Sequence, residues 1–148
     1  MYLGRPRQDL WQGDIFVGVP IVEVSGEERK DWRGKVIVLS HECELAKPST
    51  RTALVVRIRG EADFNPDQWG HIKKNRLYNG MYLEGAGPHM PGFVDFRLIH
   101  RVRIDVLERC EKIASLTEEA RQALPAYLWR FLTRRLPDTE TDAPDQQD

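Results

Sequence analysis

The amino-acid sequence predicts a mainly β domain that ends in one long helix, a β+α fold class. Two patterns carry this prediction: several short apolar runs typical of strands, and an apolar stripe at helical spacing after residue 115. Short strands followed by an amphipathic helix favour a small, strongly bent antiparallel sheet or barrel on which the helix packs. The 148 residues suit one domain. We expect it over residues 1–136, followed by an acidic disordered tail over 137–148.

Three strands are predicted in the first half of the chain. Asp14 to Val24 forms the first strand. Pro20 within it indicates an edge strand or a sharp bend, because proline cannot donate to the ladder. Residues 25–35 are charged and are interpreted as a loop. Val36 to His41 is the second strand, and Thr52 to Arg59 is the third.

A short inserted helix and two more strands are predicted next. Asn65 followed by a proline is typical of a helix start, so we expect a helix over residues 66–75. Strands are expected over 77–83 and 93–104, and the second is long enough to need a bend or bulge. His100 falls on the apolar face of that strand, which is typical of a core histidine with a satisfied hydrogen bond.

The long C-terminal helix has two candidate N-caps. These are Ser115, which forms a capping-box pattern with Glu118, and Thr117. The apolar stripe continues to Leu132 at three- and four-residue spacing. Pro125 lies inside this stripe, so we expect the helix to be kinked or split there.

The composition excludes several classes of protein. The two cysteines, Cys43 and Cys110, form no C-x-x-C pair. This argues against a disulfide scaffold or a zinc finger and favours a reducing, cytoplasmic compartment, while a single bridge between them stays open. No apolar run approaches the roughly 20 residues that span a bilayer. The N-terminal residues 1–12 lack the apolar segment of a secretory signal, so we expect no membrane association.

Polar and reactive side chains directly follow the second predicted strand, at Ser40, His41, Glu42 and Cys43. If the strand continues to residue 43, His41 and Cys43 share one face, and the imidazole could lower the thiol pKa and activate a nucleophile. The alternative is a capped strand end with Cys43 buried as a small hydrophobe. No pair of potential ligands has a recognised zinc spacing, so we expect neither a metal nor another cofactor.

Basic residues on the predicted strands are the strongest indication of nucleic-acid binding. If the third and last strands are neighbours, their arginines form a basic patch that follows phosphates. An exposed Trp32 ring could stack a base. The alternative is a solvated sheet face whose arginines pair with carboxylates. Without the five acids of the tail, 22 basic residues face 18 acidic ones, a net charge of +4. The candidate RNA-binding residues are Trp32, Arg57, Arg59, Arg97, Arg101 and Arg103.

Four segments together resemble the MazF/PemK-like toxins in order and spacing: QGDIFVGVP (12–20), RGKVIVLS (33–40), ALVVRI (53–58) and residues 94–124. The resemblance implies an SH3-like barrel with a C-terminal helix, a homodimer, and metal-independent cleavage of single-stranded RNA. It assigns the catalytic cation to Arg33, with Lys35 as a substitute. The family also places a Ser or Thr after the third strand, where this chain has Arg59 and Gly60.

Three hypotheses for the function follow. The first is an RNA-binding protein, with endoribonuclease activity through Arg33, Lys35 and His41. The second is a non-catalytic interaction module on the same barrel, which binds a partner protein such as an antitoxin. The third is a thiol enzyme that uses Cys43 and His41, with Glu42 beside them.

Overall fold

The computed structural model describes residues 3–4, 9–85 and 89–135. Its main element is a seven-stranded antiparallel sheet. The strands are β1 (Leu3–Gly4), β2 (Asp14–Ser25), β3 (Glu28–Val38), β4 (Thr52–Arg59), β5 (Gly80–Leu83), β6 (Gly92–Arg103) and β7 (Glu111–Leu116). The helices are α1 (Glu42–Leu45), the 3-10 turn η1 (Glu61–Asp63), α2 (Pro66–Lys73), α3 (Ile104–Glu108) and α4 (Glu118–Arg135).

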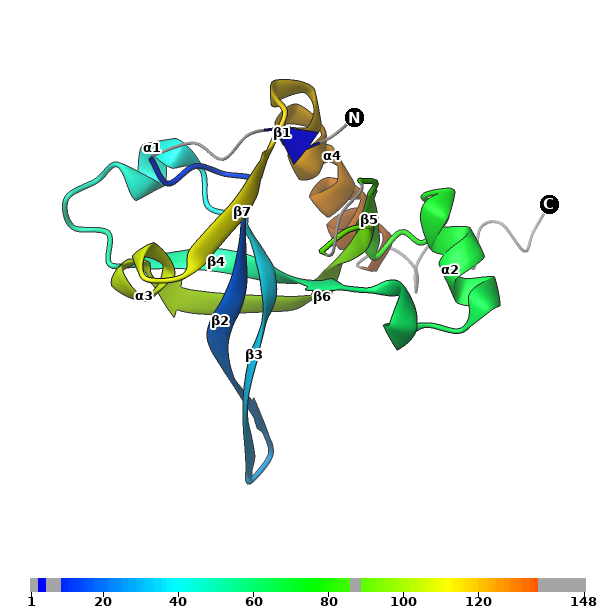
Figure 1. The fold of residues 1–148 in the computed structure, drawn as a ribbon, viewed down its shortest axis with the longest axis horizontal. Coiled ribbons are helices and arrows are strands. Elements are labelled where there is room, and N and C mark those ends of the chain that lie inside the picture. The colour runs from blue at the N-terminus through cyan, green and yellow to red at the C-terminus, as the bar shows by residue number, and fades with distance from the viewer. Residues whose placement is uncertain (1–2, 5–8, 86–88, 136–148) are drawn as a thin grey trace.

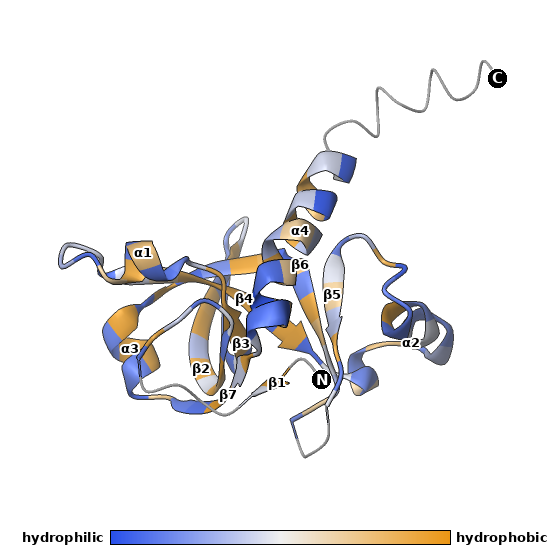
Figure 2. Cartoon of the chain, turned by 90° about the horizontal axis from the view of Figure 1, so that it is seen from above, coloured by the Kyte–Doolittle hydropathy of each residue, from blue (hydrophilic) through white to orange (hydrophobic). Residues whose placement is uncertain are grey.

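The strands are arranged in the order β1-β7-β2-β3-β4-β6-β5. The predicted mainly β architecture with a C-terminal helix is therefore confirmed. Within the described residues the two outer strands, β1 and β5, do not pair with each other, so the sheet is open rather than closed into a barrel. Helices α1 and α3 lie at one end of the molecule and α2 at the other (Figures 1 and 2).

The charged segment 25–35, predicted to be a loop, is instead mostly strand. It turns at Gly26, which has a φ of 61°, and continues as β3 in register with β2 from Ser25↔Glu28 onward. Strand β7 pairs with β2 only as far as Val17, and β4 pairs with β3 only from Val36. Residues 19–34 therefore form a two-stranded projection, the hairpin arm, which extends away from the rest of the sheet (Figure 1). The first residues of β3, 28–31, are exposed on both faces, so no apolar alternation marks this half of the arm in the sequence.

The predicted break in the first strand is confirmed. The register of β2 against β3 shifts between Phe16 and Val19, and Gly18 between them has a φ of 66°. A bulge of this kind bends the strand and lets its outer half leave the sheet. Pro20 lies in that outer half, where β2 pairs with β3 alone, so its missing donor costs no ladder bond on the other side.

The middle of the chain follows the prediction closely. Strand β4 spans Thr52–Arg59, and β6 beside it carries the expected irregularity, a register shift between Val56 and Ile58. Helix α2 starts at the predicted place, where the Asn65 side chain accepts a hydrogen bond from the Gln68 amide at 2.8 Å. The predicted strand over 77–83 is shorter, because only its last four residues, β5, pair with β6.

Only one of the two predicted N-caps of the C-terminal helix is confirmed. Ser115 is not a helix cap; it is buried in β7, where its hydroxyl donates to Asp14 Oδ1 at 2.7 Å. The alternative cap is correct, since Thr117 Oγ1 accepts a hydrogen bond from the Ala120 amide at 3.3 Å. Helix α4 then runs through Pro125 to Arg135 as one helix and is not split.

The sheet has an apolar core on each face. One core lies beneath α4 and includes Ile37, Val56 and Phe96 from the sheet with Leu124 and Phe131 from the helix. The second core, on the other side, contains Phe16, Val36, Val38, Val55 and Leu107. Strand β4 contributes alternate residues to both, as its sequence pattern predicts. No helix among the described residues is long and apolar enough to cross a membrane.

Candidate functional site

The segment Ser40–Cys43 forms a capped turn rather than a strand end with aligned reactive groups. Strand β3 stops at Val38, and Ser40 Oγ accepts a hydrogen bond from the Leu54 amide at 2.8 Å. His41 is the N-cap of α1, since its Nδ1 accepts from the Cys43 amide at 3.1 Å. The second strand, predicted to end at His41, ends three residues earlier and does not continue to residue 43, so His41 and Cys43 do not share a strand face. The capping bond explains why a histidine stands here.

Glu42 links two helices. Its carboxylate accepts from Arg121 of α4 at 2.6 Å, and Arg121 also binds Glu118 within its own helix. The Glu42 and Arg121 side chains are each no more than one-fifth exposed. A paired, largely buried carboxylate of this kind holds α1 against α4. Glu42 thus has a structural partner that the sequence did not reveal.

Both thiols are free. Cys43 is exposed, so the expectation that it is buried as a small hydrophobe is wrong. Cys110 is half-buried; burial raises the pKa of its thiol, and Arg33 and Arg109 act weakly in the opposite direction. Within the described part of the chain, no group of three or more His, Cys, Asp or Glu side chains is arranged to hold a metal ion.

Arg33 and Lys35, the predicted catalytic cations, bind backbone carbonyls on neighbouring segments. Arg33 Nη1 donates to Gly18 O at 3.2 Å, and the Lys35 ammonium donates to His89 O. Burial lowers the pKa of Lys35. The contacts of His41 are with its own turn. The structure therefore does not bring the three predicted catalytic residues together.

The strands that carry the predicted RNA-binding arginines are neighbours, as expected, but the arginines do not form one patch. The register Leu54↔Arg101 and Thr52↔Arg103 places those two arginines on one face of the sheet. Arg57, three residues after Leu54 on β4, points to the opposite face.

Carboxylates pair with several of these arginines. Arg59 and Arg97 both bind the buried Asp95, at 3.4 and 2.9 Å, and Arg103 binds Asp105 at 2.6 Å. For these three, the solvated-face alternative describes the observed contacts.

Arg57 and Trp32 do come together, at the base of the hairpin arm. The guanidinium carbon of Arg57 lies 4.2 Å from the centroid of the Trp32 ring. A Cβ atom on Gly34 would overlap Cζ3 of Trp32, so the edge of the ring packs against the backbone of its own strand at Gly34. His100 of β6 meets the Trp32 ring edge-on, with centroids 5.9 Å apart. We call Glu23, Trp32, Gly34, Arg57 and His100 the Trp32 cluster.

The Trp32 cluster contains buried polar atoms without a hydrogen-bond partner among the described residues. They are Glu23 Oε1, Trp32 Nε1 and His100 Nε2. The Glu23 and His100 atoms are 3.6 Å apart, just beyond hydrogen-bond distance. Burial lowers the pKa of His100, and Arg57 adds to this while Glu23 opposes it. The side chains of the Trp32 cluster therefore do not satisfy all of the cluster's own hydrogen-bonding groups.

This geometry changes the role predicted for Trp32. One face of its ring is covered by Arg57 and its Cζ3 edge lies against Gly34, so that covered face cannot stack a base. The partly buried Arg57 guanidinium is instead held in orientation by its contact with the indole. The sequence indicated Trp32 and Arg57 separately. It gave no signal for Glu23 or Gly34, because their roles arise from register across three strands.

No protein-family model matches the chain, and no curated protein matches its sequence.

Proposed function

We propose that this chain binds single-stranded RNA through Arg57, which Trp32 holds in place, on a divergent MazF/PemK-like, SH3-like framework. The observation that carries the proposal is the Arg57–Trp32 stack at 4.2 Å, beside buried polar atoms that have no hydrogen-bond partner in the described part of the chain. The strongly bent β2 and β6 strands fit such a framework. The free thiols fit the expected cytoplasmic setting.

The chemistry of Arg57 suits an unpaired base. Single-stranded RNA exposes bases that stack on guanidinium planes as well as on aromatic rings. A guanidinium already stacked on an indole loses little freedom when a base adds to the stack, which favours binding. The positive charge also attracts the neighbouring phosphate. Neither Arg33 nor Lys35 contacts His41 among the described residues, so the proposal is of binding rather than cleavage.

Fluorescence anisotropy with a labelled ten-nucleotide single-stranded RNA tests the proposal. Arg57→Ala should weaken binding about tenfold, within the range for loss of one stacked base. Arg57→Lys keeps the charge but loses the plane, so it should recover only part of the affinity. Arg29→Ala is the matched control, because Arg29 is an exposed arginine of the same hairpin arm, paired with Asp31. Equal affinities for wild type and Arg57→Ala would refute the proposal.

A second candidate function is protein interaction through the hairpin arm, with a second copy of the chain as the partner. Val22 and Val24 are 50% and 71% exposed on the same face of the arm. A two-stranded hairpin alone is marginally stable in water, so a partner would stabilise it. Sedimentation should then show a dimer that Val24→Glu dissociates. A monomeric wild type at high protein concentration would exclude this candidate.

A further inference from the structure

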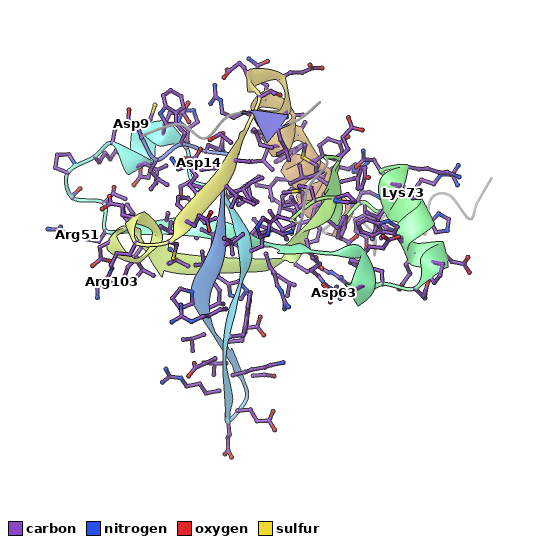
Figure 3. All side chains as sticks on the ribbon, viewed as in Figure 1. Asp9, Asp14, Arg51, Asp63, Lys73 and Arg103 are labelled. Atoms are coloured by element: carbon purple, nitrogen blue, oxygen red, sulfur yellow. The ribbon has the colours of Figure 1, made fainter. Side chains whose placement is uncertain are left out.

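A second polar site lies at the other end of β4, on the turn between α1 and β4. A hollow of about 520 Å³ opens there. Its lining includes four hydroxyl side chains and two guanidinium groups, from Ser40, Ser49, Thr50, Arg51, Thr52 and Arg101. Leu54 and Glu44, whose carboxylate is paired with Lys47, complete the lining. We call this hollow the hydroxyl groove. Figure 3 shows Arg51 at this end of the molecule, next to Arg103.

Backbone pairing fixes the two arginines of the groove. Arg101 lies opposite Leu54 in the β4–β6 ladder, and Arg51 O accepts the Ile104 amide at 2.9 Å. The turn itself is held by Thr50, whose hydroxyl donates to Glu44 O at 2.8 Å. The groove is therefore built on paired strands and a hydrogen-bonded turn, so its side chains start from fixed positions.

Charge distinguishes Arg51 and Arg101 from the basic residues around them. Lys47 binds Glu44 at 2.8 Å, and Arg103 binds Asp105 at 2.6 Å, so both are neutralised. Neither Arg51 nor Arg101 has a carboxylate within ion-pair distance in the described part of the chain. Two unneutralised guanidinium groups lining one hollow repel each other, and an anion between them would remove that repulsion.

The groove also supplies neutral donors. Ser40 Oγ accepts the Leu54 amide, which leaves its own hydroxyl hydrogen to donate. Ser49 and Thr52 add two more hydroxyl groups to the lining. Guanidinium forks with hydroxyl donors are the combination that recognises phosphoryl oxygens.

We infer that the hydroxyl groove binds a phosphoryl group, through Arg51 and Arg101. The inference goes beyond the proposed RNA contact at Arg57, because Arg101 and Arg57 lie on opposite faces of the sheet. The phosphoryl group comes either from free phosphate or from RNA, and the two sources present the same oxygens to the groove.

Titration of inorganic phosphate into the full-length protein, followed by amide NMR shifts, tests the inference. Saturable shifts should concentrate on residues 49–52 and 101. Arg51→Ala and Arg101→Ala should each weaken the affinity at least fivefold, while Arg29→Ala on the hairpin arm should leave it unchanged. Both groove arginines are exposed, so their removal should not unfold the protein, and unfolding curves verify this. Equal shifts with sodium chloride at matched ionic strength would overturn the inference.

RNA with and without a 5′-phosphate identifies the source. Tighter binding of the phosphorylated RNA, lost in Arg51→Ala and Arg101→Ala, supports the groove and assigns it to RNA. If neither variant changes the RNA affinity and the wild-type protein still binds inorganic phosphate, the result supports the groove and assigns it to free phosphate. No phosphate binding, together with RNA affinities unchanged in both variants, overturns it. Arg57→Ala should leave phosphate binding intact in every case. A failure of the RNA proposal at Arg57 can therefore be told apart from a failure of the phosphate site in the hydroxyl groove.

Discussion

Trp32 shows how a single residue acquires a role that its type alone does not reveal. The edge of the indole packs against the backbone at Gly34, and the guanidinium of Arg57 lies over its ring. His100 makes a T-shaped contact with the same ring. An isolated tryptophan in a charged segment indicates an exposed stacking ring. The structure makes it a support for the arginine, because β3 and β4 bring the two side chains to the same face.

Gly34 is the residue on which that arrangement depends. Gly34→Ala should destabilise the fold by about 1–3 kcal/mol, because the new methyl group overlaps the Trp32 ring and forces the ring to move. Gly60→Ala is the matched control, since a Cβ there meets nothing within 4 Å. Urea unfolding measures both. The same midpoint for the two variants would show that the ring does not pack against Gly34.

His100 should make stability depend on pH. Burial holds its pKa below the ordinary value of the unfolded chain, so the unfolded state takes up the proton first as the pH falls through about 6.5. Stability is therefore full above that pH and falls below it, by at most about 1.4 kcal/mol per pH unit for one group. Glu23, Arg57 and Trp32 are the groups that face His100 from the packed strands.

Urea unfolding at pH 5, 6 and 7 checks this dependence. His100→Gln, which cannot titrate, should lose less stability between pH 7 and pH 5 than the wild type. The other three histidines are common to both proteins, so the difference in slope reports His100 alone. Parallel pH profiles would contradict a lowered pKa at this site.

At the scale of elements, the predictable ones are those whose sequence signal is local. Strand β4 alternates between two cores, and α2 carries an Asn-Pro start, so both were predicted at or near their observed bounds. The β3 half of the hairpin arm and β7 were missed, whereas the β2 half was predicted as part of the first strand. The first residues of β3, 28–31, are exposed on both faces and have no core to impose alternation, and β7 is recognised by long-range pairing, including the Ser115–Asp14 bond.

The α1–α4 link gives a prediction at this scale. Glu42→Ala should destabilise the protein by about 1–3 kcal/mol, because it leaves the largely buried Arg121 without its α1 carboxylate. Glu44→Ala on the same short helix is the control and should change stability little, because its pair with Lys47 is exposed. Thermal unfolding compares the two. If Glu44→Ala were the more damaging change, α1 would not be held through Glu42.

At the scale of the whole molecule, the bent sheet separates two basic sites. Arg57 belongs to the face of the second core, and Arg101 to the opposite face. Sequence spacing could place the five arginines on neighbouring strands. It could not assign each arginine to a face of the sheet, because the register of β4 against β6 shifts between Val56 and Ile58. Three of the candidate arginines are ion-paired, as the solvated-face alternative expects.

The central claim is that Arg57 binds RNA because Trp32 holds it. A double-mutant cycle on RNA affinity tests this most directly, with wild type, Trp32→Ala, Arg57→Ala and the double variant measured by anisotropy. Unfolding curves for all four confirm that each is folded. If the account is correct, Arg57→Ala weakens binding about tenfold in the wild type and has almost no further effect when Trp32 is absent. Additive effects of the two substitutions would contradict it.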